Sequence, residues 1–186
     1  MELSTIIIGA GGCGRNILEK LQAQQATTAR HMLVNTDQRS LDESTINCKV
    51  HLDRLEPDYI TRSVDMGASP NVILTAGLGG ATGMAVILAL AEWARHEGKN
   101  VSVVVTMPFS FEGEHRMRKA KEAIARLRQV CQQVIALNND DYMTKEFVDG
   151  PASRLIDHVN SLAGIALCSF VSDTNAETDD EGPSFS

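Results

Sequence analysis

The chain has 186 residues, of which 43% are hydrophobic and 22% are charged, the mixture of an ordinary globular domain. Its net charge of −7 excludes the basic footprint that a duplex-binding protein needs. The longest apolar run, residues 84–91, is far shorter than the roughly 20 residues that cross a bilayer, and Glu2 stands where an export signal would begin. We therefore expect a cytoplasmic protein that neither enters a membrane nor binds nucleic acid.

The acidic residues gather near the end of the sequence. Residues 173–186 contain acidic but no basic side chains and carry −5, which leaves −2 for the remainder. Because this segment is rich in Ser, Thr, Gly and Pro, we expect one folded domain over residues 1–172 and an acidic disordered tail over 173–186. The cysteines are scattered without a Cys-x-x-Cys pair, so they indicate structural thiols and no metal site.

Short β-branched runs alternate with segments of helical periodicity. In chain order, the pattern predicts a strand at residues 5–8, a helix at 16–24, strands at 32–34, 49–52 and 71–74, a helix at 82–97, a strand at 101–105, a helix at 112–132, a strand at 134–137 and a last helix at 154–170. Gly98 stands where the second helix needs a left-handed cap. This alternation predicts an α/β domain, a three-layer doubly wound parallel sheet of the Rossmann type.

A glycine-rich loop at residues 9–14 joins the first strand to the first helix. Its glycines fit G-x-G-x-x-G, a dinucleotide fingerprint. Backbone N–H groups of such a loop can close on an anion, and the helix adds its positive end. Taken alone, the loop has two interpretations, which are phosphate binding and a tight strand-to-helix turn.

A second glycine-rich loop, residues 75–83, follows the fourth strand and again opens a helix. In an open doubly wound sheet, strands one and four are neighbours where the strand order reverses, and the loops at their carboxyl ends flank the ligand crevice. Two such loops on one crevice predict a polyphosphate held from both sides.

Further motifs complete a recognisable pattern. The loop 9–14, the run Val34-Asn35-Thr36-Asp37, the loop 75–83, the segment 104–113 with Arg116, and Asn138-Asn139-Asp140 resemble the tubulin/FtsZ superfamily over roughly residues 4–168. The likeness is closer to the N-terminal GTP-binding domain of bacterial FtsZ than to tubulin. It implies a GTPase-domain fold, GTP or GDP as ligand, and a setting in cell division or cytoskeletal assembly. Whether Mg²⁺ accompanies the nucleotide is left open.

The resemblance also implies a set of nucleotide-binding residues, none of them catalytic. These are Gly11, Gly12, Cys13, Gly14, Asn16, Asn35, Asp37, Gly77, Gly79, Gly80, Ala81, Thr82, Gly83, Pro108, Glu112, Arg116, Asn138, Asn139 and Asp157. Asn16 would read the guanine edge, and Glu112 and Arg116 would contact the ribose and nearby oxygens. The structural alternatives are a helix cap for Asn16 and an i,i+4 ion pair for Glu112 and Arg116.

Departures from the family pattern bear on mechanism. Ala81 and Met84 interrupt the second loop's signature, and the Gly-rich segment that faces the γ-phosphate in the family is missing or compressed between residues 52 and 71. Asp157 is the candidate acid for guanine, although an alignment on Gly164 puts Ile156 there. The sequence ends 16 residues after Phe170, so we expect neither the family's catalytic acidic loop nor its second domain, and at most weak GTP hydrolysis.

Three functions remain open at this stage. The leading hypothesis is a stand-alone GTP/GDP-binding domain that binds, caps or regulates a filament of the tubulin/FtsZ type, with a full-length FtsZ-type filament or a second copy as partner. The second is an NAD-binding Rossmann protein, in which Asp37, 23 residues after Gly14, would meet a ribose. The third is a nucleotide-free interaction module that retains only the fold.

Overall fold

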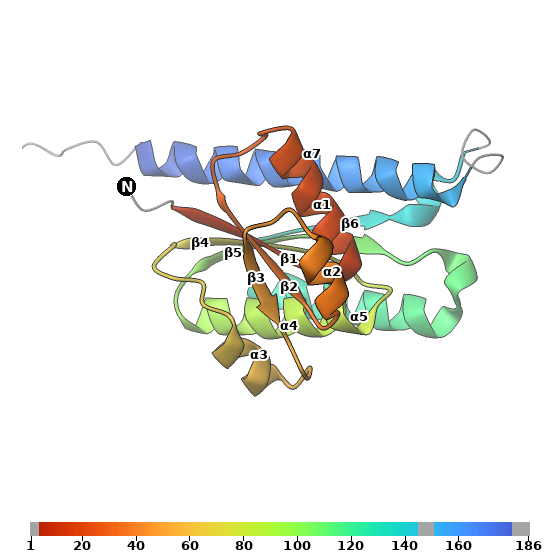
Figure 1. Cartoon of the computed structure of the whole chain (residues 1–186), viewed down its shortest axis with the longest axis horizontal. Helices are drawn as coiled ribbons and strands as arrows, with labels where there is room; N and C mark the ends of the chain where they lie inside the picture. The colour runs from red at the N-terminus through yellow and green to blue at the C-terminus, as the bar shows by residue number, and fades with distance from the viewer. Residues whose placement is uncertain (1–3, 145–150, 180–186) are drawn as a thin grey trace, which may run out of the picture.

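A six-stranded parallel sheet forms the centre of the structure, a computed structural model that describes residues 4–144 and 151–179 (Figure 1). Its strands are β1 (Thr5–Ala10), β2 (Arg30–Asn35), β3 (Cys48–His51), β4 (Asn71–Gly77), β5 (Asn100–Met107) and β6 (Gln133–Asn138). Their order across the sheet is β3-β2-β1-β4-β5-β6, and all neighbours are parallel. The predicted α/β class is confirmed, and the order reverses between β1 and β4.

Helices cover both faces of this sheet and make the two outer layers (Figure 1). They are α1 (Gly11–Ala23), α2 (Gln38–Glu43), α3 (Pro57–Ser63), α4 (Ala81–His96), α5 (Glu114–Val130) and α7 (Ala152–Asp179), with short 3₁₀ turns η1 (Ser110–Glu112) and η2 (Asn139–Tyr142). Ile7 packs in the core with α1 and α7, whereas Ile6 and Ile8 pack in the core with α3, α4 and α5. Side chains alternate along β1 because successive residues of a strand point to opposite faces.

Two helices, α2 and α3, were not predicted from the sequence. Each buries a single apolar side chain, Leu41 in α2 and Ile60 in α3, so neither has the repeated apolar spacing that indicates a helix. The predicted left-handed cap after α4 is confirmed, since Gly98 has a φ of 74°.

The last helix is longer than predicted. α7 continues to Asp179, so the expected boundary after residue 172 falls inside a helix, and residues 173–179 are helical where a disordered segment was expected. Phe170 and Val171 are buried in the core, so the apolar contacts of α7 continue to residue 171. The rest of the expected tail, residues 180–186, lies outside the described residues.

One stretch of α7 has the length and apolar composition of a membrane span. It is Ser153–Asp173, with a mean hydropathy of 1.4, in contrast to the shorter apolar run on which the sequence expectation rested. Its apolar side chains Ala163, Leu167 and Phe170 are buried against the sheet. The core helix of a folded domain passes the same test, so this stretch is weak grounds for a membrane span.

Candidate functional site

The loops after β1 and β4 meet at the carboxyl end of the sheet. Gly11 has a φ of 66°, in the left-handed region that favours glycine. A Cβ atom at Gly11 would lie 3.5 Å from the backbone nitrogen of Gly83, so the two loops are in close contact. The pairing of β1 with β4 causes this approach, because it brings the first residues of α1 and α4 together.

Close strand-to-helix contacts explain two other glycines of these loops. A Cβ at Gly14 would lie 2.7 Å from the carbonyl carbon of Gly9, and a Cβ at Gly83 would lie 2.7 Å from the carbonyl oxygen of Gly77. Neither contact is sterically allowed, so a side chain at either position would push its helix away from its strand. Each loop therefore contains one glycine that allows a helix to pack closely against the preceding strand.

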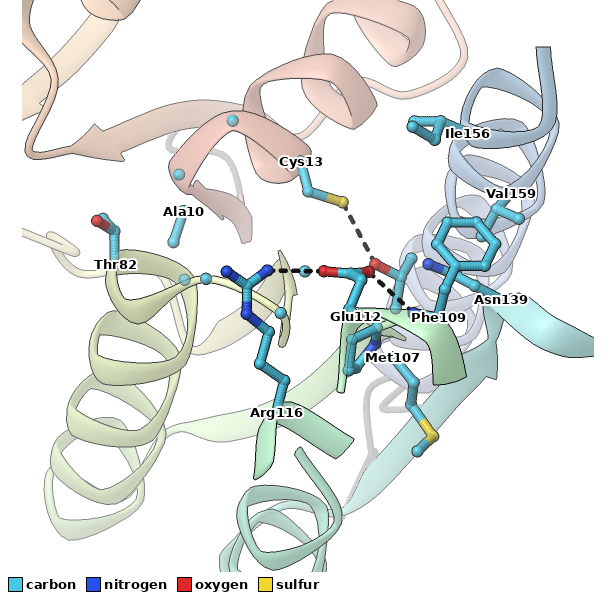
Figure 2. Close-up of a pocket in the computed structure, with 18 of the residues that line it drawn as sticks. Ala10, Cys13, Thr82, Met107, Phe109, Glu112, Arg116, Asn139, Ile156 and Val159 are labelled. Carbon is cyan, nitrogen blue, oxygen red and sulfur yellow. Dashed lines mark hydrogen bonds and ion pairs between the residues drawn. The ribbon is translucent and has the colours of Figure 1, made fainter. Parts of the chain in front are cut away.

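A cavity of about 440 Å³ opens between the two loops, the end of β5 and α7 (Figure 2). The structure brings most of the predicted site residues to it: Gly11, Gly12, Cys13, Asn35, Gly77, Gly79, Gly80, Ala81, Thr82, Gly83, Pro108, Glu112, Arg116 and Asn139. Figure 2 shows Thr82 on one side, Ile156 and Val159 on the other, and Arg116 with Glu112 between them.

The other predicted site residues do not line the cavity. Gly14 packs α1 against β1, and Asn16 is exposed on α1. Asn138 donates from its Nδ2 to Oδ1 of Asp141 at 2.9 Å. Its neighbour Asn139 lines the cavity, whereas Asn138 does not.

The two predicted aspartates have structural partners instead. Asp37 caps α2, because its Oδ1 accepts a hydrogen bond from the backbone nitrogen of Ser40 at 3.2 Å. Asp157 is exposed on α7 and pairs with Lys20 of α1 at 3.4 Å. Ile156, the alternative that the sequence alignment offered, lines the cavity in its place.

Glu112 and Arg116 form the i,i+4 ion pair of the structural alternative, and they also line the cavity. Oε2 of Glu112 lies 2.9 Å from Nη1 of Arg116, and Oε1 accepts a hydrogen bond from the backbone nitrogen of Phe109 at 2.9 Å. The carboxylate therefore ties η1 to the first turn of α5. The pair fixes a guanidinium group beside the glycine loops.

Thr82 of the second loop is held from outside the cavity. Its Oγ1 lies 2.9 Å from Oγ1 of Thr36, which follows β2, and the Thr36 carbonyl oxygen lies 3.1 Å from Nε2 of His51 at the end of β3. This chain of contacts connects the second glycine loop to the ends of two further strands. It fixes the position of the Thr82 hydroxyl at the cavity.

Cys13 stands where the first loop meets β5 and α7. Its Sγ lies 3.4 Å from Oγ1 of Thr106 and 3.5 Å from Oδ1 of Asn160. Burial raises the pKa of the Cys13 thiol, and the hydrogen bond with Thr106 lowers it less. The thiol therefore stays protonated at neutral pH and can donate to the Asn160 amide.

Several lining residues were not among the predicted nucleotide-binding residues: Ala10, Thr106, Met107, Phe109, Val159 and Asn160. A signal existed for Thr106 and Met107, because they end β5, and the carboxyl ends of parallel strands meet at one edge of the sheet. Val159 and Asn160 had no comparable signal, since the sequence of this segment predicts a helix but not which of its sides faces the cavity.

The departures from the family pattern at Ala81, at Met84 and between residues 52 and 71 affect the cavity in different ways. Ala81 lines the cavity without closing it. Met84, in the first turn of α4, packs against the hydrophobic core and is not among the lining residues. Residues 53–70, all of them described, fold around α3 and do not reach the cavity. Across the described parts of the chain, no group of three or more His, Cys, Asp or Glu side chains could hold a metal ion.

Comparisons with known proteins agree on the family. The family model described as Tubulin/FtsZ family, GTPase domain, matches residues 56–145. Cell division protein FtsZ 2 of Methanocaldococcus jannaschii is 31% identical over a region that covers 75% of this chain and 41% of that protein. Cell division protein FtsZ 2 of Rhizobium meliloti is 30% identical over a region that covers 76% of this chain and 46% of that protein. The chain thus spans less than half the length of these two relatives.

Solved structures share the fold. The structure of an empty FtsZ dimer from M. jannaschii matches this chain with a TM-score of 0.75 and 23% sequence identity. The match covers 92% of this chain and 55% of the FtsZ chain. A GTPγS-bound protofilament of CetZ2 from Haloferax volcanii matches with a TM-score of 0.72 and 17% sequence identity. This match covers 90% of this chain and 57% of the CetZ2 chain. On the family model, the relatives and the shared fold, this chain belongs to the tubulin/FtsZ superfamily and corresponds to its GTPase domain.

Proposed function

We propose that the cavity binds a guanine nucleotide, GTP or GDP, with its phosphates against the two glycine loops. The contact between Gly11 and Gly83 carries this proposal, because it brings the N-terminal ends of α1 and α4 to one cavity. Free backbone N–H groups and the positive helix ends favour an anion there. Membership of a family whose model is described as a GTPase domain supports guanine as the base.

The cavity has two unlike sides that suggest an orientation for the ligand. The glycine wall consists of Gly11, Gly12, Gly79, Gly80 and Gly83, and the α7 wall consists of Phe109, Asn139, Ile156, Val159 and Asn160. Phosphates suit the glycine wall, which offers backbone donors. The apolar side chains of the α7 wall suit a planar base. Arg116 lies between the walls, within reach of the sugar or the phosphates.

Hydrolysis in this cavity is expected to be slow. Of the lining residues, all within the described part of the chain, Glu112 is the one carboxylate, and Phe109 and Arg116 engage both its oxygens. No lining acid is thus left to position a water molecule against a γ-phosphate. We therefore propose that the chain binds, caps or regulates a cytoplasmic filament of the tubulin/FtsZ type in cell division.

Nucleotide binding is tested with the purified chain. Acid precipitation followed by chromatography identifies any co-purifying nucleotide, and thermal unfolding is measured with GTP, GDP, ATP and NAD, each with and without Mg²⁺. GTP or GDP should raise Tm more than ATP or NAD, because a ligand that binds the folded state stabilises it. Stabilisation by NAD alone would favour a dinucleotide-binding protein, although Asp37 is engaged in capping α2.

A cavity-filling variant makes this test specific. Gly80 lines the cavity, and a Cβ there would meet nothing within 4 Å, so Gly80→Leu should fill the cavity without disturbing the fold. The matched control is Ala125→Leu at an exposed position of α5. Gly80→Leu should lose the nucleotide-dependent rise in Tm and Ala125→Leu should keep it. Loss in both variants, or in neither, would contradict the proposed site.

The filament role has a separate test. The chain is added to polymerising full-length FtsZ, and the pelleted mass and the release of phosphate from GTP are measured. A capping or regulating domain should change both at substoichiometric amounts, and the Gly80→Leu variant should change them less. Unchanged filament mass and turnover would remove the filament role while nucleotide binding could still stand.

A further inference from the structure

The two edges of the sheet are built differently. β3 forms one edge with four residues, two of which, Lys49 and His51, are exposed. β6 forms the other edge with six residues, and its run 134–137 is apolar and contains neither a charge nor a proline. Short length and charged side chains are the usual protection of an edge strand against pairing with another chain. β3 therefore has this protection and β6 lacks it.

The helices leave the apolar side chains of β6 partly uncovered. Val134 and Ala136 pack on the side of the sheet that α5 covers, and Ile135 packs on the side that α7 covers (Figure 1). Each of residues 134–137 is nevertheless partly exposed, whereas every residue of the central strand β1 is buried. Because side chains on both faces of β6 are partly exposed, its outer edge is open to solvent in the described part of the chain.

The backbone of β6 leaves hydrogen bonds unmade along this edge. Among the described residues, β5 is the one strand beside β6. Successive residues of a strand direct their N–H and C=O groups to opposite sides, so about three donors and three acceptors of β6 point away from β5. A second copy of the same strand, turned antiparallel, presents the same alternation and can pair with all of these groups.

We propose that β6 pairs with β6 of a second copy of this chain, antiparallel and about a two-fold axis, so that two sheets become one continuous sheet. A two-fold interface of this kind uses the same surface on both copies, so association stops at the dimer. The pairing does not involve the glycine wall or the α7 wall of the cavity. It is therefore independent of the proposed nucleotide binding.

Charges on α5 favour a second copy over a strand from an unrelated protein. Arg126 pairs with Glu92 of α4. Glu114, Lys121 and Arg128 are displaced from Arg126 by about 200–240° around the helix, at about 100° per residue, so they lie on the side away from α4 and toward the edge at β6. All three are exposed, and within residues 4–144 and 151–179 none of them has an ion-pair partner.

The two-fold arrangement supplies these partners. Each α5 lies over β5 and β6, so the two α5 helices of the dimer lie side by side and antiparallel on one face of the joined sheet. Glu114 and Arg128 are equally far along the helix from Lys121. Glu114 of each copy therefore meets Arg128 of the other, and Lys121 meets its own counterpart at the axis. A strand from an unrelated protein would bring no such matching helix.

Sedimentation velocity of the whole chain tests the association. Over a series of protein concentrations we expect monomer and dimer, no larger species, and the same dissociation constant with and without GTP. A chain that stays monomeric at every concentration, or that forms open-ended polymers without a dimer, would overturn the proposal. The rise in Tm with GTP is measured separately, so the proposed function stands or fails by itself.

Hydrogen exchange locates the interface. Amides of β6 should exchange more slowly as the protein concentration rises, because pairing with a second strand protects them. Amides of β3, the other edge, are the internal control and should exchange at the same rate throughout. A dimer that leaves the exchange of β6 unchanged would overturn the proposal.

A variant that strengthens the dimer tests the axis on α5. Lys121→Ala removes the contact between like charges, so the dissociation constant of the dimer should fall about threefold. The matched control is Lys119→Ala, an exposed lysine on the side of the helix that faces α4, and it should have no effect. Misfolding cannot explain a gain in association. Equal effects of the two variants would contradict the antiparallel placement of the helices.

An exchange of charges tests the same placement in the other direction. Arg128→Glu should weaken the dimer roughly tenfold, because both symmetry-related pairs with Glu114 become repulsive. Adding Glu114→Arg to this variant should restore the original dissociation constant. Circular dichroism checks that both variants fold. A double variant as weak as Arg128→Glu alone would overturn the antiparallel pairing.

Discussion

The two walls of the cavity are built in different ways. The glycine wall consists of backbone from two loops, each of which lies directly between a strand and a helix. The α7 wall consists of side chains from η1, η2 and α7, which are separated in the sequence and meet only through the fold. The first wall offers backbone donors for phosphates of any nucleotide. The second presents apolar side chains together with the amide groups of Asn139 and Asn160.

The glycine wall also depends on packing that does not face the ligand. Gly14 lets α1 approach β1, and Gly83 lets α4 approach β4, each by admitting a backbone atom where a Cβ would stand. Gly12 and Gly80 have free space around them and line the cavity. Glycines in one loop therefore have two separate tasks, and substitutions can separate them.

The largest expected effect is that of Gly14→Ala. Its new Cβ would lie 2.7 Å from the Gly9 carbonyl carbon and 3.0 Å from the Thr75 carbonyl oxygen, so α1 must shift. We expect a loss of about 1–3 kcal/mol in the free energy of unfolding, measured in denaturant, together with loss of nucleotide binding. At an exposed helix position, Gly→Ala normally raises the free energy of unfolding by about 1 kcal/mol. A decrease for Gly14→Ala would therefore indicate the steric conflict with β1.

Gly12→Ala is the control for this substitution, in the same loop and helix. A Cβ at Gly12 meets nothing within 4 Å, so its stability should be unchanged or slightly higher. Equal losses of stability in the two variants would contradict the division of tasks between the glycines.

An intermediate effect is expected where the two walls are joined. Glu112→Ala removes the acceptor for the Phe109 backbone nitrogen and the partner of Arg116, so both should lose their fixed positions. We expect GTP affinity to fall roughly tenfold, with a smaller change in stability.

Glu122→Ala controls for the loss of a carboxylate from α5. It breaks the exposed 3.8 Å pair with Arg118, outside the cavity lining, and should leave affinity almost unchanged. Titration with a fluorescent nucleotide measures both variants. Similar affinities for them would show that the pair near Phe109 does not organise the site.

The smallest effect concerns Cys13, which contacts both walls. Burial raises the pKa of this thiol, so iodoacetamide should modify it slowly at pH 8, and the rate should still rise at pH values where a free cysteine levels off, above about 8.5. Bound GTP should protect it. Peptide mass spectrometry distinguishes Cys13 from the other cysteines, and fast modification that GTP does not slow would place the nucleotide elsewhere.

The same pKa shift gives a sign for stability. A thiol whose pKa is higher in the folded state than in the unfolded state favours folding in its protonated form. Its contribution is therefore complete below about pH 8.5 and is lost as the pH rises through the folded-state value. Cys13→Ser should weaken this alkaline dependence in thermal unfolding, and an unaltered dependence would argue that the thiol is not buried in solution.

Prediction from the sequence succeeded where local patterns repeat. The valine-rich run of β5, the long apolar α4 and both glycine loops were identified in chain order, and Gly98 was placed correctly as a cap. It failed for α2 and α3, which bury one apolar residue each, and for the end of α7, where acidic composition suggested disorder.

The predicted site residues divide in the same way. Those on the glycine loops line the cavity because their position relative to the sheet follows from their place between a strand and a helix. Asp37 and Asn16 do not, because a residue type and an approximate spacing do not fix the direction of a side chain. Asp157 misses the cavity by one position on α7, where neighbouring residues point about 100° apart.

The sequence by itself determined the α/β class, the parallel sheet and the two loops that form the glycine wall, because strand and helix periodicity and glycine content are local properties. Only the tertiary structure decided that Ile156, and not Asp157, lines the cavity opposite those loops, and that Val159 and Asn160 line it as well. Their placement depends on how α7 lies against β4, β5 and β6, and contacts between residues so distant in the chain leave no periodic trace in either segment.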